Sequence, residues 1–146
     1  MTVNAAVRLA AASDLEAIVA LRMAFERATR DSGSLDEAER RAEIASLLGP
    51  DLRAGRLLCW MAEIGGRAVA QAALRILGRG EGELLNVYTE PDCRGRGLGS
   101  SLVAAAVGEA RALGLSRLSL QPTEDSRRIY ERAGFREAGR GMVMDL

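Results

Sequence analysis

Residues 90–102 read EPDCRGRGLGSSL and place three glycines and two arginines within six residues, directly before an apolar, alanine-rich run. Glycine lowers helix stability, so a cluster at the start of a helix indicates a specific function. The first N–H groups of a helix have no partner within it, and glycines let a ligand approach them closely. Each N–H donated to a charged oxygen contributes about 1.5–3 kcal/mol. The stretch therefore predicts an anion-binding site, most naturally for a phosphate.

Two common phosphate-binding patterns do not fit this stretch. The Walker pattern needs a lysine followed by serine or threonine, and residues 90–102 contain no lysine. The dinucleotide pattern G-x-G-x-x-G would need glycine at Ser100, and the acid expected about 20 residues further on is missing. Ser119 and Gln121 stand there instead. Both nucleotide-binding interpretations are disfavoured.

Length and composition restrict the remaining classes of protein. The chain has 146 residues, of which 48% are hydrophobic and 27% charged, as in a globular protein with one core. Twenty basic and twenty acidic residues give no net charge, which argues against binding to nucleic acid. No apolar stretch reaches the roughly 18 residues of a membrane span, and the N-terminus lacks the pattern of a secretory signal. We expect a cytoplasmic protein that binds neither nucleic acid nor membrane.

The chain contains no histidine, which narrows the possible chemistry further. Ser-His-Asp and Cys-His catalysis and His-containing zinc sites are excluded. The two cysteines, Cys59 and Cys93, show no metal-binding spacing. We therefore expect no metal, and acid–base chemistry from carboxylates, tyrosine, cysteine, lysine, a terminus or water.

Hydrophobic periodicity and turn signals predict a mixed α/β, or α+β, domain over residues 1–146. Capping signatures at Ser13–Glu16 and at residues 34–37 predict the starts of two helices, and Gly49-Pro50 is expected to end or kink the second. The element order is β-α-α-β-β-β-α-β-α-β-β. The expected strands are 7–10, 56–64, 67–77, 83–89, 115–121, 135–138 and 141–145, and the later helices are 98–113 and 124–133.

Arg94, Gly97 and Gly99 match the pattern R-x-x-G-x-G, and the stretch SRRIYERAGF follows at residues 126–135. Together these motifs resemble the coenzyme A pyrophosphate loop and the last helix of the GNAT superfamily of acetyl-CoA-dependent N-acetyltransferases. The element order follows that family over essentially the whole chain. The resemblance implies a central, mostly antiparallel twisted sheet of six or seven strands, flanked by about four helices.

The resemblance also implies acetyl-CoA as co-substrate. The strand before the glycine loop would separate from the next strand, and its exposed backbone at Val87 to Thr89 would pair with the pantetheine arm. The glycine loop would hold the pyrophosphate. The implied coenzyme-binding residues are Val87, Tyr88, Thr89, Arg94, Gly95, Arg96, Gly97, Leu98, Gly99, Ser100, Thr123 and Ser126. Two of these depart from the family pattern, which usually has asparagine in place of Thr123 and alanine in place of Ser126. Threonine can still cap the helix, but a side-chain amide contact to the coenzyme would be lost.

Acetyl transfer to an amine requires two proton transfers. At pH 7 only about one in a thousand alkylamines is neutral, a deficit worth about 4 kcal/mol. Glu83 is the candidate base, directly or through water, and Glu81 is a weaker alternative. Tyr130 matches the position of the family's general acid, which protonates the departing thiolate. Cys93 could act as a nucleophile, but no base is placed beside it.

The acceptor is expected to be a primary amine on a small molecule or a peptide. Acceptors in this family lie near the first two helices, where acids and arginines alternate in this chain, a pattern typical of solvated faces. The acids are Glu26, Asp31, Asp36, Glu37, Glu39 and Glu43, and the arginines are Arg22, Arg27, Arg30, Arg40 and Arg41. Phe25 and Trp60 are expected in the core, with a pocket role as the alternative. A non-catalytic acyl-CoA sensor or subunit is the competing function, and an edge strand could support a homodimer.

Overall fold

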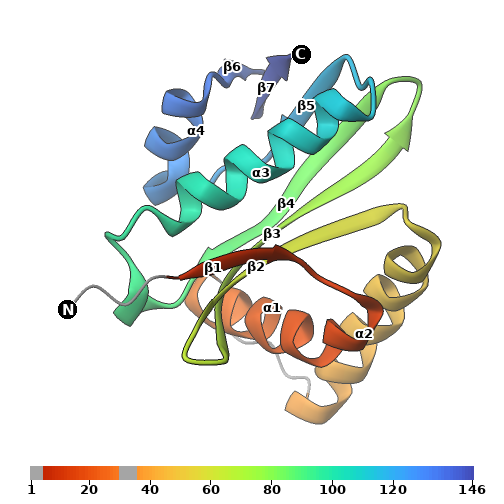
Figure 1. Ribbon diagram of the computed structural model, residues 1–146, viewed down its shortest axis with the longest axis vertical. Coiled ribbons are helices and arrows are strands. Elements are labelled where there is room, and N and C mark those ends of the chain that lie inside the picture. The colour runs from red at the N-terminus through yellow and green to blue at the C-terminus, as the bar shows by residue number, and fades with distance from the viewer. Residues whose placement is uncertain (1–4, 30–35) are drawn as a thin grey trace.

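Seven strands form one sheet in the order β1-β2-β3-β4-β5-β7-β6 within residues 5–29 and 36–146, which the computed structural model describes (Figure 1). Neighbouring strands run antiparallel except β4 and β5, which are parallel. The strands are β1 (Ala6–Leu9), β2 (Leu57–Ile64), β3 (Arg67–Gly78), β4 (Glu81–Thr89), β5 (Arg117–Leu120), β6 (Arg136–Ala138) and β7 (Gly141–Asp145). The helices are α1 (Leu15–Thr29), α2 (Glu37–Ala54), α3 (Leu98–Ala112) and α4 (Arg127–Ala133).

Helices cover both faces of the sheet (Figure 1). Alternate residues of a strand point to opposite faces, so Cys59 and Met61 of β2 pack with α1 and α2. Trp60 and Ala62 pack with α3 on the other face. The central strand β3 is consequently buried on both faces from Val69 to Leu74, which explains its unbroken apolar character apart from one glutamine.

The helix boundaries differ from the sequence expectation at α1, α2 and α4. The helix expected over residues 124–133 begins at Arg127, because Glu124–Ser126 form a 3₁₀ turn. Helix α2 runs through Gly49-Pro50 to Ala54 and ends at Gly55, whose φ of 76° is left-handed. Of the two expected effects of Gly49-Pro50, a stop or a kink, the stop is therefore wrong. Helix α1 begins after a 3₁₀ turn, where the Asp14 carboxylate accepts the Ala11 N–H at 2.7 Å in place of a Ser13–Glu16 capping pair. Ser34 and Leu35 of the second capping signature lie outside the described residues.

The feature that positions the site is the separation of β4 from β5. Their parallel register covers only Glu81 to Glu83, paired with Arg117 to Ser119, whereas β4 continues to Thr89. On the β3 side the register shifts, because Leu85 pairs with Ala73 but Tyr88 pairs with Gln71. The extra residue is a bulge at Asn86, whose φ of 54° is unusual outside glycine. Bulges bend a strand, so the last residues of β4 turn away from β5 and keep backbone groups available on that side.

No helix of the described residues has the length and apolar character needed to cross a membrane. Across residues 5–29 and 36–146, no cluster of three or more histidine, cysteine, aspartate or glutamate side chains is arranged to hold a metal ion.

Candidate active site

A cleft of about 540 Å³, here called the loop cleft, lies where the end of β4 meets the glycine loop, α1 and α4. It brings together most of the coenzyme-binding residues that the sequence predicts. These are Val87, Tyr88, Thr89, Arg94, Gly95, Gly97, Leu98, Gly99, Ser100, Thr123 and Ser126. Arg96 is exposed and does not line the cleft.

The glycine loop has the backbone geometry of an anion site. Gly95 and Gly97 have φ angles of 79° and 76°, which glycine adopts without a steric penalty. The first helical hydrogen bond of α3 runs from the Ser101 N–H to the Gly97 carbonyl at 3.0 Å. The N–H groups of the three preceding residues therefore have no partner within the helix, and all three residues line the cleft. The loop and helix terminus can donate several N–H groups to one anion.

Arg94 is exposed, but its side chain is bound to the end of β4. Its Nε donates to the Thr89 carbonyl at 3.0 Å, and its guanidinium carbon lies 5.8 Å from the centre of the Tyr88 ring. This arrangement keeps a positive charge beside the glycine loop.

The two departures from the family pattern bind each other. The Ser126 hydroxyl accepts the Thr123 N–H at 2.9 Å and the Thr123 hydroxyl at 2.8 Å, and it donates to the Thr123 carbonyl at 3.0 Å. These bonds close the turn that leads into α4. Thr123 and Ser126 thus form a coupled pair that shapes the wall of the loop cleft.

Tyr130 lies behind that wall and does not line the loop cleft. Its side chain is buried, and its ring packs edge-on against Phe135 with 5.9 Å between ring centres. Burial raises the pKa of Tyr130 to about 12, and a hydrogen bond with Ser126 opposes this rise. The phenol is therefore protonated throughout the physiological range.

A second cleft of about 630 Å³, here called the helix cleft, lies between α1, α2 and the sheet. It contains Glu83, whose carboxylate lies 3.8 Å from the Arg75 guanidinium of β3. Phe25, Thr29 and Thr123 line both clefts, so the two adjoin each other where β4 and β5 separate. Phe25 has the pocket role that the sequence left as the alternative, whereas Trp60 is in the core, as expected.

Charged residues of α1 and α2 beside the helix cleft form a network that the sequence did not predict. Arg22 donates to the Asn86 side-chain oxygen at 2.7 Å and to Glu26 at 3.3 Å. Arg40 binds both oxygens of Glu26, and this hydrogen bond is the main reason why the pKa of Glu26 is lowered. The side chains of Arg22, Glu26 and Arg40 are only 23%, 15% and 25% exposed. The expectation of a solvated face is wrong for these three residues, and Arg30 and Asp31 lie outside the described residues.

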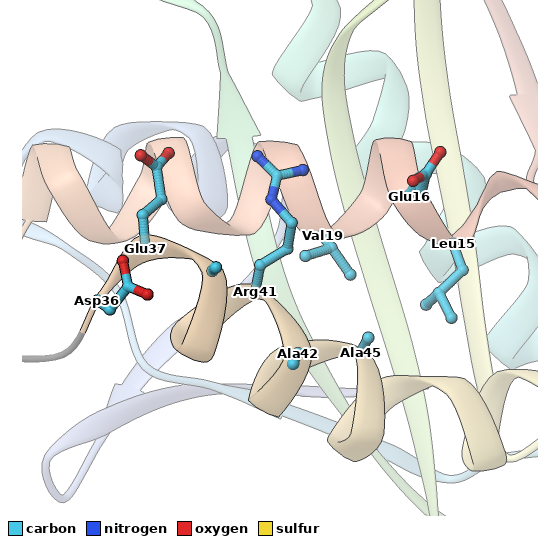
Figure 2. A pocket seen from close by; sticks show the side chains of 9 residues that line it. Leu15, Glu16, Val19, Asp36, Glu37, Arg41, Ala42 and Ala45 are labelled. Carbon is cyan, nitrogen blue, oxygen red and sulfur yellow. The ribbon is translucent and has the colours of Figure 1, made fainter.

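A third hollow of about 690 Å³ lies between α1 and α2 (Figure 2). Figure 2 shows Leu15 and Val19 of α1 pointing toward α2, and Ala45 pointing back toward α1. Charged side chains from both helices stand at its edges. It shares no lining residue with the loop cleft or the helix cleft and contains neither Tyr130 nor Glu83. The candidate active site is therefore the pair of adjoining clefts.

The model of the Acetyltransferase (GNAT) family matches residues 15–135. The chain belongs to the GNAT family. This assignment confirms the family and the fold that the sequence predicts. The individual site residues of this GNAT protein stay predictions.

Individual relatives agree with the family. This GNAT chain is 36% identical over 87 residues to glucosamine 6-phosphate N-acetyltransferase of Trypanosoma brucei brucei. The match covers 56% of the chain and 59% of that protein. A GCN5-related N-acetyltransferase from Ralstonia eutropha JMP134 has 29% identity and a TM-score of 0.80, covering 92% of this chain and 94% of that one. A Clostridium acetobutylicum structure with acetyl-CoA has 21% identity and a TM-score of 0.77, covering 92% of each chain, and shows the same fold.

Several residues that line the loop cleft of this GNAT protein were not singled out from the sequence. They are Ala28, Thr29, Asp125, Ile129 and Arg132. Helical spacing offered a signal, because Ile129 and Arg132 of α4 follow Ser126, the residue before this helix, at intervals of three. Ala28 and Thr29 similarly follow Phe25 by three and four residues.

Substitutions of Asn86 test how the bulge in β4 contributes to stability. Asn86→Gly preserves the positive φ but removes the bond to Arg22, so we expect a loss of about 1 kcal/mol in the free energy of unfolding. Asn86→Val should cost about 1–2 kcal/mol more, because a β-branched residue is strained at this φ. Urea unfolding of both variants measures the difference. Equal stabilities would mean that the backbone at this position relaxes to an extended conformation.

Proposed function

We propose that this protein is an N-acetyltransferase that moves an acetyl group from acetyl-CoA to a primary amine by direct attack in a ternary complex. The observation that carries the proposal is the separation of β4 from β5 beyond Glu83. Because of this separation, the loop cleft with its anion-binding glycine loop adjoins the helix cleft, which contains the Glu83 carboxylate. Two substrates held in line across that gap gain up to about 7–11 kcal/mol toward the barrier. We propose that residues 1–146 form a single acetyltransferase domain.

The residues of the loop cleft fit coenzyme A. The helix N-terminus at Leu98, with Gly95 and Gly97 in the left-handed region, would bind the pyrophosphate, and Arg94 would add charge. Val87 to Thr89 have no pairing with β5, so their backbone can bind the amide groups of the pantetheine arm. Acetyl-CoA supplies the activated thioester.

The protein's own groups would manage the protons. Glu83, directly or through water, takes the proton of the ammonium so that the nitrogen lone pair can attack the carbonyl carbon. A C–N bond forms as the C–S bond breaks, and the departing sulfur takes the Tyr130 proton. The nitrogen then loses its second proton, which water carries to the Tyr130 phenolate, so that the phenol is restored. Ser126, which hydrogen-bonds Tyr130, stands in the wall of the loop cleft between the two. The separate positions of Glu83 and Tyr130, in the helix cleft and behind the loop cleft, support distinct roles for base and acid.

Acetyl-CoA-dependent release of free thiol across a panel of amines tests this function, with calorimetric binding of acetyl-CoA in parallel. The panel should include amino acids, peptides and, given the name of the Trypanosoma relative, glucosamine 6-phosphate. Turnover with any amine supports the transferase. Tight binding with no turnover across a broad panel would favour a non-catalytic acyl-CoA sensor. Absence of binding would contradict both.

Arg94→Ala should weaken coenzyme A binding about 10-fold, because it removes a charge-assisted contact and the support at the end of β4. Arg96→Ala is the matched variant in the same loop, and we expect a smaller effect because Arg96 lies outside the loop cleft. Calorimetric dissociation constants for coenzyme A compare the two. A larger effect at Arg96 would reverse the assignment of the two arginines.

A further inference from the structure

Three arginines from three different elements line the helix cleft. Arg22 comes from α1, Arg40 from α2 and Arg75 from β3. Arginine presents a planar set of hydrogen-bond donors that matches carboxylate and phosphate oxygens. Three arginines in one cleft therefore indicate an anionic ligand, provided that the protein's own carboxylates do not occupy all of their donors.

The carboxylates around the cleft are distributed unevenly among these arginines. Glu26 binds both Arg22 and Arg40, and Arg40 also pairs with Glu43 at 2.9 Å. The carboxylate of Asp51, although it lines the cleft, binds the exposed Arg56 at 3.0 Å.

Arg75 differs from the other two arginines. Its ion pair with Glu83 spans 3.8 Å, a separation too long for a hydrogen bond. Its side chain is 31% exposed, so it is both accessible and only loosely paired.

We propose that the acceptor amine carries an anionic group, a carboxylate or a phosphate, which Arg75 binds while Glu83 faces the amine; this rests on the proposed function. Arg75 and Glu83 are cross-strand partners in β3 and β4, so their side chains project on the same face. A molecule with both charges replaces one loose ion pair by two charge-assisted hydrogen-bonded contacts. A purely cationic amine would instead meet the Arg75 charge and be repelled.

The rest of the cleft suits the carbon skeleton of such a molecule. Ile44, Leu47 and Leu48 of α2 line it, and Leu47 is 60% exposed although it is a large apolar side chain. Covering this wall removes apolar surface from water. The cleft therefore fits a small molecule that carries an amine, an anionic group and an apolar face.

The test compares matched acceptors that differ only in the anion. One pair is an amino acid and its amide, and the other is glucosamine 6-phosphate and glucosamine. For the wild type we expect kcat/KM for the anion-bearing member of at least one pair to exceed that for the member without the anion by about 10- to 100-fold. Arg75→Gln should reduce this ratio to about 1, and Arg75→Lys should retain part of it. The pair that shows the preference identifies carboxylate or phosphate as the ligand.

Arg136→Gln is the control, because Arg136 binds Asp145 at 2.9 Å in β7 and lines neither cleft. It should leave the ratio unchanged. A wild-type ratio near 1 for both pairs, or a preference that persists in Arg75→Gln, would overturn the inference while thiol release still supports the transferase.

A binding measurement separates this inference from the proposed function. Calorimetry of the same pairs, with the protein saturated by desulfo-CoA, needs no turnover. Arg75-dependent binding of the anion-bearing member without thiol release from acetyl-CoA would sustain the inference and contradict the transferase. Equal binding of both members, or binding of neither, would overturn the inference.

Discussion

Replacing Tyr130 with phenylalanine is expected to lower kcat about 10²- to 10⁴-fold. Burial raises the pKa of this phenol to about 12, so the hydroxyl stays protonated well above neutral pH. The same shift makes it a weaker acid than a free tyrosine. The Tyr130 phenol therefore donates its proton best to a sulfur that becomes negatively charged in a site from which water is equally excluded. In such a site the free thiolate is also disfavoured. Steady-state kcat at saturating acetyl-CoA and amine measures the loss.

The pH profile and a packing control separate this chemical role from a structural one. Between pH 7 and 10 the wild-type kcat should show no decline caused by Tyr130, because deprotonation occurs only near its raised pKa of about 12. Phe135→Leu removes the ring that packs against Tyr130 but leaves the hydroxyl, so it should lower stability more than turnover. A Tyr130→Phe variant with unchanged kcat would remove this residue from the mechanism.

The sequence was sufficient where local chemistry and regular spacing decide the structure. The glycine loop needs residues that tolerate positive φ at Gly95 and Gly97, and both adopt it. The apolar spacing of α3 and the stop at Gly114 are local features, and the helix ends at Ala112 as expected within one residue. The motifs around Gly97 and Tyr130 were specific enough to indicate the family.

Features that depend on tertiary contacts could not be predicted from the sequence. The stretch ELLNVYT has the apolar and aromatic residues of a regular strand, and only its central Asn86 hints at the bulge. The arginines of α1 and α2 alternate with acids as on a solvated face, yet Arg22 and Arg40 reach the same Glu26 because the two helices pack side by side. Pro50 lacks an N–H for the helix, but α2 continues because Leu48 and Gly49 are buried against the rest of the protein. In each case packing outweighs the local signal.

Gly141→Ala should destabilise the protein by about 3 kcal/mol, at the upper end for an overpacking substitution. A Cβ at position 141 would clash with the backbone carbonyl oxygen of Leu120 and lie 3.0 Å from the Gln121 side-chain nitrogen. The Gln121 side chain can move, but the carbonyl belongs to β5, whose Leu120 pairs with Met142 of β7. The substitution must therefore push these two strands apart. Urea unfolding measures the free-energy loss.

Gly108→Ala is the matched control, because the same methyl group is added at an exposed position of α3 with no heavy atom within 4 Å. It should stabilise the protein by about 0.5–1 kcal/mol, since alanine favours helix over glycine. The functional consequence separates the two variants further. Gln121 and Thr123, directly after β5, line the helix cleft, so displacement of β5 by Gly141→Ala should also raise KM for the acceptor. A Gly141→Ala protein with wild-type stability would show that β7 can shift away from β5 without loss of free energy. The close approach of β5 and β7 would then not be what positions Gln121 and Thr123 in the wall of the helix cleft.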